Sequence, residues 1–211
     1  MSNVATIRQR GADSDIQWTL VALAVWFFIA VALGTSGALT GNGQPPIGIG
    51  LAIALPVILF VVDRRFGGHV LGGLARLELP ALIAAQTFRV GGVFFLIAWW
   101  GGTLPGGFAL SAGLGDIAVG LAAPFIAAAV AARRPHHLAL ARIWNVLGTL
   151  DLVTAVSLGV LHARSPIGLL AGPVTTDVMA RYPLSLIPTF AVPLALMLHI
   201  STYRRLGTGA V

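Results

Sequence analysis

The sequence predicts an all-α protein that crosses a membrane six times, with both termini on the cytoplasmic side. Of its 211 residues, 57% are hydrophobic and 9% are charged, and the mean hydropathy is +0.90. Soluble domains carry about 25% charged residues. The basic residues stand in pairs between apolar runs and form no single patch, which indicates membrane topology and argues against a nucleic-acid partner.

Six apolar segments are each close to the ~20 residues that a helix needs to cross the hydrocarbon core, and the second is the shortest. We therefore expect one membrane domain over residues 1–211, embedded in the lipid bilayer. The predicted helices cover about 18–39, 47–62, 80–100, 113–132, 140–161 and 184–203.

The first segment follows Arg8 and Arg10, so a cleaved signal peptide is an alternative to a retained helix. Its apolar run is longer than the apolar region of a typical signal peptide, and the residues GTSGALTG that follow contain no A-x-A cleavage motif. We expect a retained helix.

The connection between the second and third segments mixes arginines with large apolar residues in the string DRRFGGHVLGGLARLEL. This composition is compatible with an interfacial helix over residues 64–79, although its four glycines disfavour a helix. The outer connection over residues 163–183 is the longest and is interrupted by prolines and glycines, so it is either a lid or a simple connector.

The arginines divide unequally between the two sides of the six predicted helices. The side that carries the termini holds ten of them, whereas the other side holds Arg164 and Arg181. By the positive-inside rule the termini are cytoplasmic, and Trp99 and Trp100 then lie at the outer interface, where aromatic residues are enriched.

Two absences restrict the chemistry. The chain has no cysteine, which excludes disulfides, thiolate metal sites, iron–sulfur clusters and covalently attached c-type haem. All 13 basic residues are arginines. A Schiff base to retinal or pyridoxal phosphate therefore has no lysine on which to form.

Arg89 is the most informative residue, because it lies in the middle of the third predicted helix. It is nine residues from the cytoplasmic end of that helix, or about 13 Å at 1.5 Å per residue. Asp151 is at similar depth in the fifth helix, so we expect these two to pair. Asp116, near the outer end of the fourth helix, is the competitor, and one guanidinium is long enough to serve both carboxylates.

Other polar side chains extend this candidate site. Ionisable groups at membrane depth are costly and usually face protein or water, although buried polar pairs also serve only to hold helices together. By depth we expect three tiers that together would make a polar track: an inner tier of Asn145, Gln86 and His199, a middle tier of Arg89 and Asp151, and an outer tier of Asp116 and His162. The predicted intramembrane site comprises Arg89, Asp151, Asp116, Gln86, Asn145, His199 and His162.

Prolines interrupt several helices. Pro183, Pro188 and Pro193 recur at five-residue intervals in PLSLIPTFAVPLALMLH, and Pro56 and Pro124 lie inside two other segments. A proline inside a helix frees a carbonyl and kinks the helix. Such breaks mark binding sites in transporters, but ordinary kinks are commoner.

The five histidines predict no metal site, because no H-x-x-H-H or H-E-x-x-H motif is present. His136 and His137 are adjacent and point about 100° apart on a helix. We predict no cofactor. Bis-histidine haem is the alternative, in which His199 would pair with His69 or His137 at the cytoplasmic side.

Four strings in the second half of the chain resemble a group of uncharacterised bacterial multispanning membrane proteins: FRVGGVFFL, LPGGFALSAGLGDIAVGLAAP, IWNVLGTLDLVTAV and YPLSLIPTFAVPLALMLH. The resemblance covers roughly residues 86 to 200. It implies a location in the bacterial inner membrane and brings no activity.

Three functions are consistent with these features. The leading hypothesis is that the protein transports or binds a small solute, an ion or a proton in a polar cavity. The second is an intramembrane enzyme that acts on a lipid or isoprenoid, with Asp116 or Asp151 as acid or base. The third is a non-catalytic subunit of a membrane complex or a homo-oligomer, in which the polar residues hold helices together.

Overall fold

The computed structural model of the chain describes residues 2–65 and 72–208, and within these ranges every regular element is a helix. η1 and η2 are 3-10 helices and η3 is a π-helix. The elements are α1 (Ser2–Ser36), α2 (Ile47–Arg65), α3 (Gly72–Arg76), α4 (Leu79–Ala85), η1 (Gln86–Gly92), α5 (Val93–Trp100), α6 (Gly106–Ala131), α7 (His137–Leu161), η2 (Thr176–Ala180), η3 (Ile187–Ala191) and α8 (Val192–Thr208).

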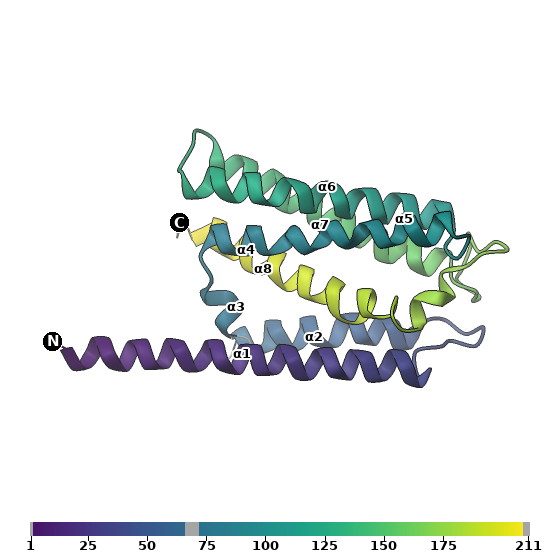
Figure 1. Cartoon of the computed structure of the whole chain (residues 1–211), viewed down its shortest axis with the longest axis horizontal. Coiled ribbons are helices and arrows are strands. Elements are labelled where there is room, and N and C mark those ends of the chain that lie inside the picture. Colours follow the sequence, from purple (N-terminus) through teal and green to yellow (C-terminus); the bar gives the residue numbers. More distant parts are fainter. Residues whose placement is uncertain (1, 66–71, 209–211) are drawn as a thin grey trace.

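The long helices run side by side between two ends of an elongated bundle (Figure 1). One end, on the left in Figure 1, holds α3, the turn between α6 and α7, and the end of α8. We call it the arginine-rich end, because it carries Arg64, Arg65, Arg76, Arg204 and Arg205. The opposite end holds the turns that follow α1, α5 and α7.

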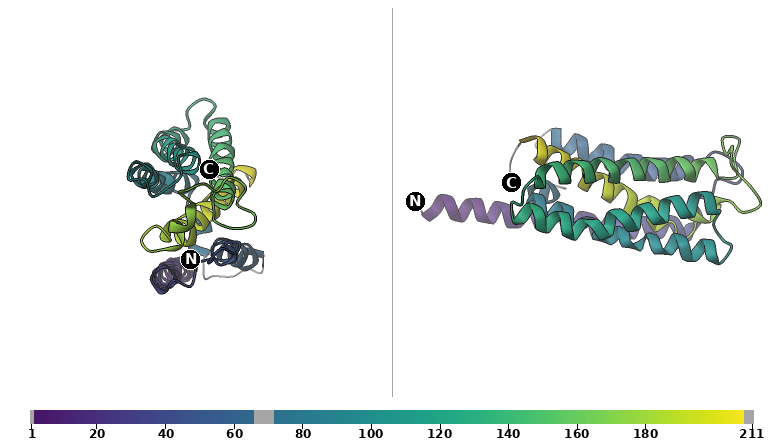
Figure 2. Two further views of the ribbon diagram at one scale, coloured as in Figure 1. Left: turned by 90° about the vertical axis from the view of Figure 1, so that its right-hand side faces the viewer. Right: turned by 90° about the horizontal axis from the view of Figure 1, so that it is seen from above.

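Helix α8 and the π-helical turn η3 lie between two groups of helices (Figures 1 and 2). On one side are α4 to α7, and on the other are α1 and α2. Trp26 of α1 secures the junction, since its Nε1 donates a hydrogen bond to the Thr189 carbonyl at 3.1 Å and its ring lies 4.7 Å from that of Phe190. Pro193 has no N–H to offer the Thr189 carbonyl four residues earlier, so the indole supplies a donor there.

Five helices are long and apolar enough to cross a membrane. They cover Ile16–Ser36, Ile47–Arg65, Leu79–Trp100, Gly106–Ala131 and His137–Leu161. Large apolar side chains of α1 and α2, among them Phe28 and Leu59, are exposed, as expected for helices that face lipid. The chain is therefore compatible with an integral membrane protein that crosses the bilayer several times.

The sixth predicted helix, 184–203, differs from the prediction. It begins with the π-helical turn Ile187–Ala191, which contains Pro188, and only then continues as α8 to Thr208. The π-helical turn leaves the α-helical part with 17 residues. Wide turns of this kind are frequent at functional sites.

Three other boundaries also differ. Helix α1 begins at Ser2, 16 residues before the predicted start at residue 18. The fourth helix begins at Gly106, directly after the extended residue Pro105 and seven residues before the predicted start. Trp99 and His162 pack on Gly106 and Gly107, where a Cβ would lie 2.9 Å from a ring nitrogen. Within the span 64–79, where the sequence suggested an interfacial helix, the structure has the five-residue helix α3, and α2 extends through Arg65. Its residues 66–71 lie outside the described ranges.

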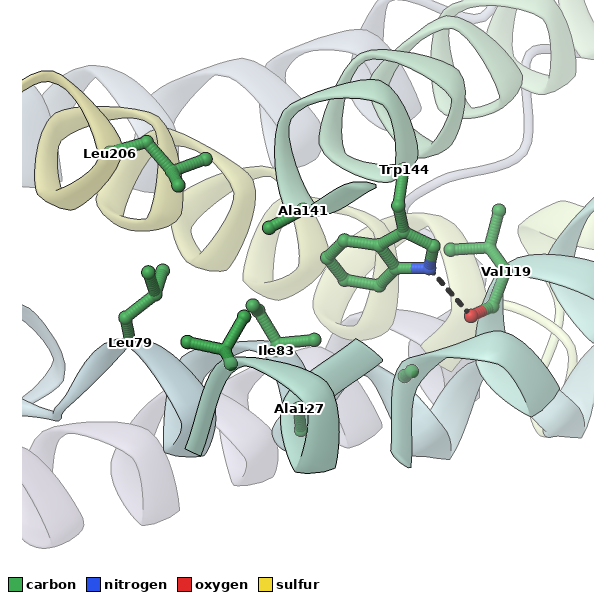
Figure 3. Close-up of a cluster of buried hydrophobic side chains, with 9 residues drawn as sticks. Leu79, Ile83, Val119, Ala127, Ala141, Trp144 and Leu206 are labelled. Carbon is green, nitrogen blue, oxygen red and sulfur yellow. Dashed lines mark hydrogen bonds between the residues drawn. The ribbon is translucent and has the colours of Figure 1, made fainter. Parts of the chain in front are cut away.

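A cluster of buried apolar side chains fills the bundle near the arginine-rich end. Figure 3 shows the Trp144 indole reaching from α7 to α6, where its Nε1 donates a hydrogen bond to the Val119 carbonyl at 3.1 Å. Leu79 and Ile83 of α4 and Leu206 of α8 complete the packing and are at most 4% exposed. This apolar plug, as we call the cluster, closes one side of the polar site described next.

Candidate functional site

Arg89 lies in η1, a 3-10 stretch in the middle of the third predicted helix. Residues three apart are eclipsed in a 3-10 helix, so Gln86, Arg89 and Gly92 form one column, and these are the three buried residues of η1. Gly92 lets the column approach α6, since a Cβ there would lie 2.6 Å from the Cβ of Asp116 and 2.8 Å from the carbonyl oxygen of Gly113. The local helix type therefore directs Arg89 into the bundle.

The guanidinium of Arg89 contacts three neighbouring helices. Its Nε donates to Asp116 Oδ1 of α6 at 2.7 Å, and its Nη2 donates to Asp151 Oδ2 of α7. Its Nη1 donates to the Gly148 carbonyl at 3.1 Å and contacts His199 Nε2 of α8 at 3.0 Å. Arg89 therefore pairs with both carboxylates that the sequence offered as alternatives.

The hydrogen bonds of His199 fix its tautomer. Arginine carries donors only, so His199 Nε2 accepts the hydrogen bond from Arg89 and carries no proton. The proton of the neutral ring is then on Nδ1, which donates to Asn145 Oδ1 at 2.8 Å. Asn145 Nδ2 also donates to the His199 carbonyl at 3.3 Å, so Asn145 holds both the ring and the backbone of His199.

Small residues allow the charged groups to come together. A Cβ at Gly148 would lie 2.6 Å from His199 Cε1, and a Cβ at Gly115 would collide with Asp151 Oδ1. A Cβ at Gly120 would lie 2.6 Å from the backbone nitrogen of Val90. The close approach of η1, α6 and α7 thus depends on glycines, as is common between membrane helices.

The three tiers expected from the sequence merge into one cluster. Asn145 and His199, placed in the inner tier, and Asp116, placed in the outer one, all lie in the same hydrogen-bonded group as Arg89 and Asp151. We call these five residues the ion-pair cluster.

The other two predicted site residues lie outside the ion-pair cluster. Gln86 is completely buried and donates from Nε2 to the Ala195 carbonyl at 3.0 Å, while its Oε1 has no hydrogen-bond partner in the described structure. His162 follows the last residue of α7 at the opposite end, and its Nδ1 donates to the Leu158 carbonyl.

The ion-pair cluster carries an excess of acid. With both aspartates ionised, Arg89 balances one of two negative charges, and His199 is neutral while it accepts from Arg89. The Arg89 side chain is 2% exposed, whereas those of Asp116 and Asp151 are 14% and 15% exposed. The carboxylates, and not the guanidinium, are therefore the groups that a proton or a cation can reach.

A cavity of about 480 Å³ lies between this cluster and the opposite end of the bundle. Its lining includes Ile53, Phe95, Phe108, Ala155 and Val192 from five different helices. On α7, Ala155 is one turn beyond Asp151, or about 6 Å along the axis. The residues of α7 that line the cavity are apolar, so the polar side chains of α7 do not continue along it from Asp151 to His162.

Two of the three histidines considered as haem ligands lie in the described residues. Both ring nitrogens of His199 contact protein groups. His137 Nδ1 contacts the Arg134 carbonyl on the exposed turn before α7. His69, the other partner considered for a haem, lies outside the described residues. Over residues 2–65 and 72–208, no three His, Asp or Glu side chains are placed to bind a metal ion together.

Reasoning from the sequence missed two features of the site. One is the Gly148 carbonyl, because a backbone acceptor leaves no signal in the sequence beyond the small residue itself. The other is the cavity, whose lining includes Arg164 and Arg181, the two arginines predicted to lie on the outer side. Their isolation on the predicted outer side was the signal that could have pointed to it.

Comparison with known proteins gives a family and no activity. No curated protein and no solved structure matches the chain. A family model described as a domain of unknown function, DUF8737, matches residues 46–207, from the turn before α2 to the penultimate residue of α8, and includes the whole ion-pair cluster. Because the match covers most of the chain, the protein belongs to the DUF8737 family.

Proposed function

We propose that the protein is a transporter of the bacterial inner membrane, in which the ion-pair cluster binds a proton or a small cation as part of solute movement. In this proposal the six helical segments all cross the bilayer. Both termini and the arginine-rich end face the cytoplasm, in agreement with the positive-inside rule.

The observation that carries the proposal is the pairing of one guanidinium with two carboxylates at the centre of the bundle. A buried charge without a partner is strongly unfavourable, so one carboxylate needs a proton or a bound cation. Arg89 is already occupied by Asp116, Asp151 and the Gly148 carbonyl, which favours a proton or cation over a second anion as the group that binds here.

The surroundings of the cluster support access from one side. The apolar plug around Trp144 fills the bundle toward the arginine-rich end, whereas the cavity lies toward the opposite end. A transporter that binds its solute from the outside has this asymmetry, and the π-helical turn at η3, which lines the cavity through Ile187 and Pro188, supplies an interrupted helix next to it.

The other two functions have less support. An enzyme that used Asp116 or Asp151 as an acid or base would first have to release that carboxylate from Arg89. A role as a complex subunit or homo-oligomer would use the exposed apolar faces of α1 and α2, which lipid covers equally well.

The experiment uses purified protein reconstituted into liposomes that contain a pH-sensitive dye. After an outward or inward pH step, and separately after a pulse of Na⁺ or K⁺, the wild type should change the internal pH faster than empty liposomes do. Asp151→Asn should abolish this difference while the variant keeps the helix content and elution volume of the wild type.

Glu78→Gln is the matched control, because Glu78 is an exposed acidic residue directly before α4 and lies outside both the ion-pair cluster and the cavity lining. It should leave the proton flux unchanged. A wild type that moves protons no faster than empty liposomes under every gradient, or an Asp151→Asn variant as active as the wild type, would exclude the proposal.

A further inference from the structure

We infer that the cavity at the opposite end is a binding site for an organic anion with a single apolar chain or ring system. The inference deepens the proposed function and rests on it for the side of the membrane that the cavity faces. Its volume of about 480 Å³ is within the range of sites for small organic ligands.

The deep part of the cavity is apolar. Phe95 and Phe108 stack edge to face with ring centroids 5.3 Å apart, and Ile53, Val156 and Val192 line the same space. A ligand that enters this part must bring hydrocarbon, since a polar group would lose its hydration there.

The rim of the cavity is basic. Arg164 and Arg181 both line it and both are exposed, and they are the two arginines on the side of the bundle where the positive-inside rule predicts few. Asp177 also lines the rim, but its ion pair with Arg164 is long, at 3.9 Å, and the two side chains are 50% and 70% exposed. Such a pair is weak, so the rim keeps a net positive charge that suits an acidic head group.

The wall of the cavity is held in place from α7. Thr176 at the start of η2 donates from Oγ1 to the Gly159 carbonyl at 2.6 Å, and its backbone nitrogen donates to the His162 carbonyl at 3.1 Å. Asp177 Oδ1 accepts from the Arg164 backbone nitrogen at 2.9 Å. The connection predicted to be a lid or a connector therefore forms an anchored wall of the site.

Gly50 provides a way to fill the cavity. It lines the cavity from α2, and a Cβ at this position meets no atom within 4 Å. Gly50→Leu should therefore add a bulky side chain to the cavity lining without a clash in the empty protein. Gly207 near the end of α8 is the matched control, because its Cβ also meets no atom within 4 Å and it lies at the arginine-rich end.

The test is photoaffinity labelling of the full chain in nanodiscs of neutral phosphatidylcholine, with decanoic acid that carries a diazirine at the end of its chain. Mass spectrometry should map the label to peptides of the cavity lining, and unlabelled decanoate should compete. Gly50→Leu should reduce this labelling more than tenfold, whereas Gly207→Leu should leave it unchanged. Arg164→Gln and Arg181→Gln should each weaken it about threefold, and together about tenfold, as expected for exposed charges.

Competition by other amphiphiles and labelling of Asp151→Asn distinguish the remaining possibilities. Competition by phosphatidylglycerol as strong as that by decanoate would identify a membrane lipid as the source of the same anionic chemistry. Decanol that competes as well as decanoate, with no effect of the arginine substitutions, would overturn the inference, as would labelling that Gly50→Leu does not reduce. Asp151→Asn should keep the label, so loss of proton flux and loss of binding report on the two proposals separately.

Discussion

Replacement of Arg89 by glutamine should destabilise the protein by about 3–5 kcal/mol. The substitution removes a side chain that is 2% exposed and leaves Asp116 and Asp151 side by side without a countercharge. Loss of one partner of a buried ion pair costs about 3–5 kcal/mol. The hydrogen bonds give a similar free energy, because the two that Arg89 donates to the carboxylates contribute about 1.5–3 kcal/mol each.

The assay is equilibrium unfolding in mixed detergent and dodecyl sulfate micelles, followed by the fluorescence of the tryptophans. Removal of both negative charges along with the positive one, in R89Q/D116N/D151N, should recover most of the loss, because no unpaired charge remains. Arg89→Lys should recover less, since one ammonium cannot reach two carboxylates, a carbonyl and an imidazole together. An R89Q free energy of unfolding within about 1 kcal/mol of the wild type would refute the charge-pairing argument.

Three further predictions concern a glycine that packs on the ion-pair cluster, the tautomer of His199, and the junction between α1 and η3. Gly148→Ala should cost about 1–3 kcal/mol through the contact with His199, whereas Gly159→Ala on the same helix, with a Cβ 3.5 Å from Phe108, should be neutral or slightly stabilising in the same titration. ¹⁵N NMR of histidine-labelled protein should show the His199 proton on Nδ1, and a proton on Nε2 would contradict the contact with Arg89. Trp26→Phe should lower the free energy of unfolding by about 0.5–1.5 kcal/mol, because the Thr189 carbonyl loses its indole donor, and an unchanged value would mean that another donor replaces it.

Hydropathy located the long helices because a bilayer requires about 20 apolar residues from every segment that crosses it. The same reasoning placed a positive charge and an acidic group at similar depth in two helices, and Arg89 and Asp151 do meet. It could not reveal that Arg89 lies in a 3-10 stretch. The 3-10 hydrogen bonding occurs together with the close packing of Gly92 against α6, which is a property of the folded bundle.

The membrane depths predicted for Asp116 and His199 were wrong because the predicted boundaries of their helices were wrong. Asp116 was placed near the outer end of a helix that begins at Gly106 and not at Gly113, so it lies ten residues in. His199 was placed near the end of a helix that in fact continues to Thr208. The boundary errors of seven and five residues correspond to roughly 10 Å for Asp116 and about 8 Å for His199, which separated groups that touch in the folded protein.

The 3-10 stretch makes the third predicted helix longer and more tightly wound than an α-helix of the same residues would be. A 3-10 helix rises about 2.0 Å and turns about 120° per residue, against about 1.5 Å and 100° in an α-helix. Over the seven residues of η1, conversion to α-helix would shorten this segment by about 3.5 Å and rotate α5 by about 140° relative to α4. Such a conversion would turn Trp99 and Trp100 about the axis of α5 and withdraw the guanidinium from its carboxylates, so the ion pairs of Arg89 and the 3-10 form of η1 stabilise each other.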